Sequence, residues 1–113
     1  ILMLRSSHTA VVERNIWWEG EWSTEPYEAA WATRAVAFVR VLERRNIAVD
    51  ATLRVQISPD GIHWCDEGNV LNVSADQDIS FARVSQFGGW LRLTGVLGPE
   101  QGLKVVVYLA LQG

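Results

Sequence analysis

Cysteine and histidine are scarce, since the 113 residues include one cysteine, Cys65, and two histidines. One thiol cannot close an intrachain disulfide, and three such side chains cannot complete the usual four-ligand structural zinc site. Long apolar runs are also missing: the apolar start at residues 1–4 ends at Arg5, and no stretch has the roughly 18 apolar residues of a spanning helix. We therefore expect a soluble chain with no cofactor, no metal site and no membrane partner, and its compartment stays open.

Positive charge is in short supply as well. Ten Lys and Arg face 13 Asp and Glu, which gives a net charge of −3. Proteins that bind nucleic acid carry a concentrated positive surface to meet phosphates, so we expect no nucleic-acid partner. The 49% of hydrophobic residues is enough for one core, and 113 residues leave no room for a second. The composition predicts a single domain over residues 1–113.

Short runs of alternating side chains recur between turn sequences. In the clearest run, 103–112, apolar residues occupy the odd positions, while Val106, Tyr108 and Ala110 lie at even positions. Successive strand residues point to opposite faces, so the odd positions are expected to face a core. Runs at 10–18, 52–58 and 90–94 alternate too, and a shorter run places Ile79 and Phe81 on one face. The pattern predicts an all-β fold, an antiparallel two-sheet β-sandwich of jelly-roll type with about seven or eight strands.

The segment 28–45 permits two interpretations. It contains no Gly or Pro, and Thr24 upstream would serve as a helix start signal. Arg34, Arg40 and Arg44 do not share a helical stripe, because the step from 34 to 40 turns about 240° net at 3.6 residues per turn. They do share one side of a strand, opposite Ala35, Ala37, Val39 and Val41. We therefore expect strand over 27–33 and 34–44.

The most informative motif is the segment 58–64, with the sequence SPDGIHW. Proline presets φ, Asp60 can accept local backbone hydrogen bonds and Gly61 suits a positive φ, so Ser58 to Gly61 predicts a tight turn between two strands. Ile62 and Trp64 are then expected to return toward the core. The Ser-x-Asp-Gly-x-x-Trp hairpin resembles that of small jelly-roll sandwiches in phage and bacterial particle proteins, and of discoidin-type modules. The chain lacks the terminal cysteine pair of discoidin modules; the resemblance implies a fold and transfers no catalytic residue.

Catalytic signals are weak. His63 and Cys65 have the same parity, as a Cys-His pair would require, but a surface histidine and a packing cysteine explain them better. Asp76 and Asp78 could form a weak calcium loop, although the EF-hand spacing is absent and acidic turn residues are usually solvated. Phosphate-binding, nucleophile-elbow and zinc-protease motifs are missing. We expect no enzyme and no catalytic residue.

Tryptophan is the exceptional residue, with six copies in the chain. Adjacent strand residues point to opposite faces, so only one of Trp17 and Trp18 can enter the core unless the loop at 19–27 covers the other. An exposed indole favours either a protein interface or a surface on which a sugar stacks.

Two functional hypotheses follow. The favoured one is a non-enzymatic structural subunit that self-associates into a homo-oligomer or particle lattice of phage-like or capsid-like type, because Val106 and Tyr108 make the second face of the last strand apolar. The alternative is a carbohydrate-binding module. Its stacking residues would be Trp17 or Trp18 together with Trp22, and the side chains bonding glycan hydroxyls would be Glu19, Glu21 and Asp66.

Overall fold

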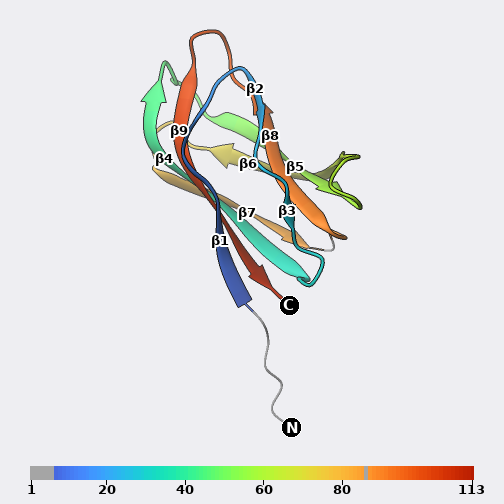
Figure 1. Cartoon of the computed structure of the whole chain (residues 1–113). Helices are drawn as coiled ribbons and strands as arrows, with labels where there is room; N and C mark the ends of the chain where they lie inside the picture. Colours follow the sequence, from blue (N-terminus) through green and yellow to red (C-terminus); the bar gives the residue numbers. More distant parts are fainter. Residues whose placement is uncertain (1–6, 86) are drawn as a thin grey trace.

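The computed structural model describes residues 7–85 and 87–113, so the apolar start at residues 1–4 lies outside it. The described chain is built from strands and contains no helix (Figure 1). The strands are β1 (Ser7–Trp18), β2 (Glu21–Ser23), β3 (Tyr27–Glu28), β4 (Arg34–Arg45), β5 (Ala51–Ser58), β6 (Cys65–Val73), β7 (Ile79–Ser85), β8 (Trp90–Val96) and β9 (Gly102–Gln112). The predicted all-β fold is confirmed, and the expected strand at 27–33 is limited to its first two residues.

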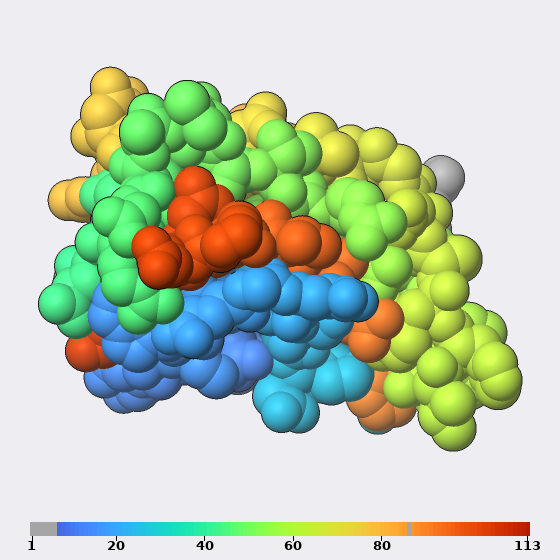
Figure 2. All heavy atoms as spheres, turned by 90° about the horizontal axis from the view of Figure 1, so that it is seen from above, coloured from blue at the N-terminus to red at the C-terminus, as the bar shows by residue number. Residues whose placement is uncertain are grey.

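The strands form two antiparallel sheets that pack face to face. One sheet has the order β1-β9-β4-β7 and the other β2-β8-β5-β6, with β3 also paired to β8. Figure 2 shows β9, in red, between β1, in blue, and β4, in green. Because β2 and β3 pair with successive parts of β8, they occupy one edge position, and nine strands fill eight places. This order is that of a jelly roll: the chain crosses from one sheet to the other between most successive strands, while β5 and β6 form a hairpin within the second sheet.

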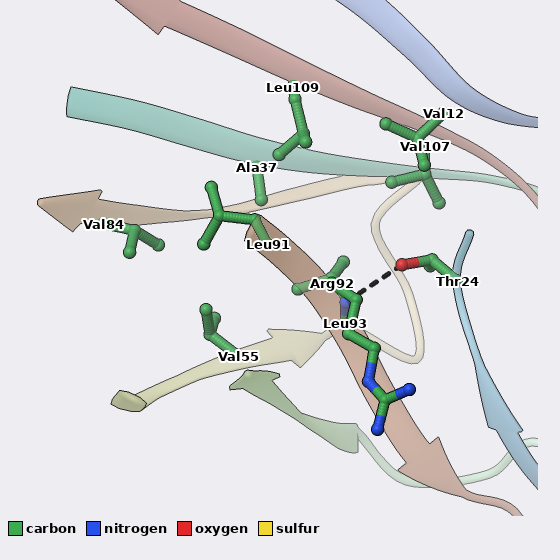
Figure 3. Close-up of a pocket in the computed structure, with 10 residues that line it drawn as sticks. All are labelled: Val12, Thr24, Ala37, Val55, Val84, Leu91, Arg92, Leu93, Val107 and Leu109. Atoms are coloured by element: carbon green, nitrogen blue, oxygen red, sulfur yellow. Dashed lines mark hydrogen bonds between the residues drawn. The ribbon is translucent and has the colours of Figure 1, made fainter. Parts of the chain in front are cut away.

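The core lies between the sheets, where the alternation of β9 is obeyed throughout. The odd positions of this strand are buried: Leu103, Val105, Val107, Leu109 and Leu111. They face the buried side chains of β5 and β8 from the other sheet, among them Leu53, Val55, Leu91 and Leu93. Figure 3 shows these two layers and the small apolar void between them, which measures about 10 Å³. A void of this size is too small for a ligand.

Within the segment 28–45, residues Arg34–Arg45 form a strand, and its odd positions Ala35, Ala37, Val39 and Val41 are buried as expected. The register with β9 shifts between Val41 and Glu43. This bulge changes the direction of Arg44, which pairs with the core-facing Leu103 and donates to the Ser74 carbonyl at 3.1 Å. The expectation that Arg44 shares a face with Arg34 and Arg40 is therefore wrong, because a bulge reverses the parity of the residues that follow it.

Candidate functional site

The structure separates the three N-terminal tryptophans. Trp18 and Trp22 lie in the core, and their rings stack with centroids 3.6 Å apart and an interplanar angle of 6°. Trp17 points outward with 37% of its surface exposed, and the Arg45 guanidinium lies 5.1 Å from its ring centroid. The expectation that one of Trp17 and Trp18 lies outside the core is confirmed.

The expected exposure of Trp22 is wrong, because only 9% of this residue is accessible. In β2 it is the middle residue, and it pairs with Gly95 on β8. A Cβ added at Gly95 would lie 2.8 Å from the Trp22 ring, so the missing side chain makes the space that the indole fills. Neither Trp18 nor Trp22 presents a face on which a sugar could stack.

The β5–β6 hairpin is fixed by side-chain hydrogen bonds to its own backbone. The Ser58 hydroxyl accepts from the N–H groups of Asp60 and Gly61 at 3.2 and 2.8 Å, and Gly61 has a φ of 79°. Asp60 Oδ1 accepts from the N–H groups of Ile62 and His63, both at 2.8 Å. The hydrogen bonds from the His63 backbone and ring, and then from Ile62, hold the pKa of Asp60 well below its ordinary value of 3.8.

The side chains after this turn do not both return to the core. Ile62 is 74% exposed, which corrects the expectation, because the connection continues as a loop until β6 begins at Cys65. Trp64 is half-buried and lies under the Arg92 guanidinium, 4.2 Å from the ring centroid. Arg92 Nε donates a hydrogen bond to Gln56 Oε1 at 2.8 Å, and Gln56 Nε2 donates one to Asp66 Oδ1 at 3.0 Å. The Gln56 amide, assisted by Arg54, lowers the pKa of Asp66.

The weak catalytic and metal candidates have other partners. His63 Nδ1 lies 2.7 Å from Asp60 Oδ2, whereas the Cys65 thiol points to the Ile57 carbonyl at 3.8 Å. In the acidic loop, Asp76 accepts a hydrogen bond from the Ser74 hydroxyl at 2.6 Å and Asp78 pairs with Arg44 at 3.4 Å. Within residues 7–85 and 87–113, no cluster of three His, Cys, Asp or Glu side chains is suited to a metal ion.

The most unusual surface is the outer face of the β1-β9-β4-β7 sheet. One row crosses all four strands: Val11 is paired with Tyr108, Tyr108 with Phe38, and Phe38 with Phe81. Phe81 is 51% exposed, and Val11 at the opposite edge is also exposed. Directly opposite residues in antiparallel strands point to the same side, so the row forms a continuous apolar ridge.

Two hollows flank this ridge, and each is lined by two arginines. The first measures about 290 Å³ and includes Arg14, Arg40 and Val106. The second measures about 380 Å³ and includes Arg34 and Arg83. We give the name arginine face to the ridge, the two hollows and the adjacent Ile79, which is opposite Arg40. It is made of these residues: Val11, Arg14, Arg34, Val36, Phe38, Arg40, Leu42, Ile79, Phe81, Arg83, Val106 and Tyr108.

Among the residues that the structure describes, none is a carboxylate partner of the arginines of this face. In the described part of the chain, ion pairs between Lys or Arg and a carboxylate are made by Arg44, Arg45, Arg54 and Lys104 only. Instead, Arg40 Nη1 lies 3.5 Å from the Tyr108 hydroxyl, and the Arg83 guanidinium lies 4.9 Å from the Phe81 ring centroid. The Arg83 guanidinium therefore lies over an aromatic ring and that of Arg40 beside a phenol hydroxyl, contacts that leave their charge available to a partner.

Of the candidates predicted from sequence, Tyr108 is half-buried on the arginine face, and Val106 lines its first hollow but is only 7% exposed. Trp17 is on the same outer surface at its Lys104 end. Sequence reasoning missed Phe38 and Phe81 as members of this face. The even parity of Phe38, shared with Arg34 and Arg40, could have indicated it.

The chain matches no known family model, no curated protein and no solved structure. Among the described residues, no helix has the length and apolar character needed to cross a membrane.

Proposed function

We propose that this protein is a non-enzymatic structural subunit that self-associates through the arginine face into a symmetric oligomer or particle, of phage-like or capsid-like type. The observation that carries the proposal is the apolar ridge, whose end residues Val11 and Phe81 stay exposed in the isolated chain. Contiguous exposed apolar surface with a polar rim is typical of protein interfaces. The rim here is arginine, which interfaces favour over lysine.

The occupant that fits this face is a second copy of the same chain. The whole chain has a net charge of −3, so the four arginines of the face, at +4, leave a net −7 on the remainder. A copy therefore offers surface of the opposite sign, and electrostatic complementarity favours the association of such patches. The aromatic side chains Phe81 and Tyr108 would be buried in the contact, and buried aromatic side chains commonly carry much of the binding energy of an interface.

Sedimentation equilibrium over micromolar concentrations tests this proposal. The wild-type chain should contain species larger than its 12.7 kDa monomer. The variant Phe81→Ser should associate more weakly and need a higher protein concentration than wild type to stay associated, since it removes the exposed end of the ridge.

The matched control is Ile62→Ser, which removes an exposed apolar side chain from the β5–β6 hairpin, away from the face. This variant should associate like wild type. A wild-type protein that stays at 12.7 kDa throughout the range would contradict the proposal, as would equal weakening by both substitutions.

A further inference from the structure

We infer that the arginine face binds the edge formed by β2 and β3 of the next copy, so that subunits join head to tail. This inference rests on the proposed self-association and names its second surface. We call that surface the acidic edge: it consists of Glu21, Glu25 and Glu28, which are exposed and form no ion pair within the described residues.

A symmetric face-to-face dimer is disfavoured by charge. In a twofold contact both partners use the same patch, so the four arginines of one arginine face would meet those of the other. Within residues 7–85 and 87–113 no carboxylate forms an ion pair with them, and like charges brought together in an interface oppose association. The face therefore needs a carboxylate-bearing surface that lies elsewhere on its partner.

The charged side chains of the arginine face and those of the acidic edge are spaced by the same distance. Arg34 and Arg40 point to the same side of β4, six residues apart, and lie in different hollows. On the acidic edge, Glu28 is opposite Trp90 and Glu21 is opposite Val96, again six residues apart along β8. At about 3.3 Å per strand residue, both separations are about 20 Å. Two carboxylates of one copy can thus reach both hollows of the next.

The surface beside the acidic edge also suits the apolar ridge. Val96 is among the most exposed apolar residues of the chain, and Trp90 is half-buried next to Glu28. The cation on this part of β8, Arg92, has its guanidinium on the Trp64 ring and its Nε–H bonded to Gln56. Two apolar side chains, Trp90 and Val96, therefore lie on the outward side of β8 beside the carboxylates Glu28 and Glu21, with Arg92 and Thr94 between them.

Charge reversal tests the inference. The face variant is Arg34→Glu with Arg40→Glu, the edge variant is Glu21→Arg with Glu28→Arg, and the swapped variant carries all four changes. In sedimentation equilibrium, the face and edge variants should each need about 100-fold more protein than wild type to associate, or more. The swapped variant should regain association, because its arginines and carboxylates have exchanged surfaces.

Controls separate the possible failures. Asp76→Arg with Glu100→Arg reverses two exposed carboxylates off the acidic edge and should associate like wild type, and thermal unfolding checks that each variant is folded. If the edge variant unfolds, the milder Glu21→Gln with Glu28→Gln replaces it and should weaken association in the same direction. Association of the edge variant at the wild-type concentration, or no recovery in the swapped variant, would overturn the head-to-tail contact and leave self-association standing. A wild-type chain that is monomeric at every concentration would overturn the proposed function itself.

Discussion

The substitution Gly95→Ala should destabilise the protein by adding a methyl group where the core has no space. The new Cβ would lie 2.8 Å from Trp22 Cζ2 and 3.1 Å from Leu53 Cδ2. Trp22 cannot move away easily, because its ring is stacked on Trp18 at 3.6 Å. Something in the packed core must therefore shift.

The magnitude follows from two opposing effects. Overpacking a core costs about 1–3 kcal/mol, and replacing glycine by alanine recovers about 0.4–1 kcal/mol by restricting the unfolded chain. The net loss for Gly95→Ala should be about 1–2 kcal/mol, which for a domain of this size lowers the melting temperature by about 4–8 °C. Thermal unfolding followed by circular dichroism measures the shift, and urea unfolding measures the free energy.

Gly102→Ala is the matched control. Its added Cβ would lie 2.7 Å from Arg45 Nη2, an equally close contact, but this atom is the far end of a flexible and partly exposed side chain. The guanidinium can move aside, so Gly102→Ala should stay within about 0.5 kcal/mol of wild type. The reasoning is refuted if Gly95→Ala melts with wild type, or if the two variants lose the same stability.

Two further predictions concern single side chains. Thr24→Val should lower the free energy of unfolding in urea by about 1–3 kcal/mol, because the buried Leu93 N–H loses its acceptor, Thr24 Oγ1, which lies 3.0 Å away. An unchanged urea midpoint would show that this N–H finds another partner. Asp60→Asn should be less stable than wild type at pH 7, and the difference should shrink as pH falls below about 4. A carboxylate whose folded pKa is lowered contributes stability above its unfolded pKa and loses it on protonation. A difference in unfolding free energy that stays constant from pH 7 to about 2 would contradict this role of Asp60.

The fold could be predicted where strands are regular. In β9, alternation alone assigned both faces correctly, because this strand faces the core along its whole length. In β1, the register with β9 shifts twice, between Val11 and Glu13 and between Glu13 and Ile16, and Asn15 has a φ of 55°. Such bulges depend on local backbone geometry and on the partner strand, so a period of two in the sequence cannot locate them.

The site was only partly predictable for a different reason. Alternation grouped Ile79 with Phe81 but did not indicate which side of β7 is inward. Hydrophobicity favours the wrong answer, because the smaller Ala82 and Val84 face the core, where the register places them opposite Ala37 and Ala35. Only the pairing of β7 with β4 decides the orientation, and it leaves Phe81 outside.

Whether Phe81 becomes covered when copies meet tests the central claim most directly. Hydroxyl-radical footprinting, read out by mass spectrometry at increasing protein concentration, compares Phe81, which is 51% exposed in the single chain, with the exposed Cys65. Cys65 begins β6, which lies in the other sheet at the edge opposite β2 and β3, and serves as the internal reference. We expect oxidation of Phe81 to fall as concentration rises while that of Cys65 stays constant. Equal oxidation of Phe81 at all concentrations would contradict self-association through the arginine face.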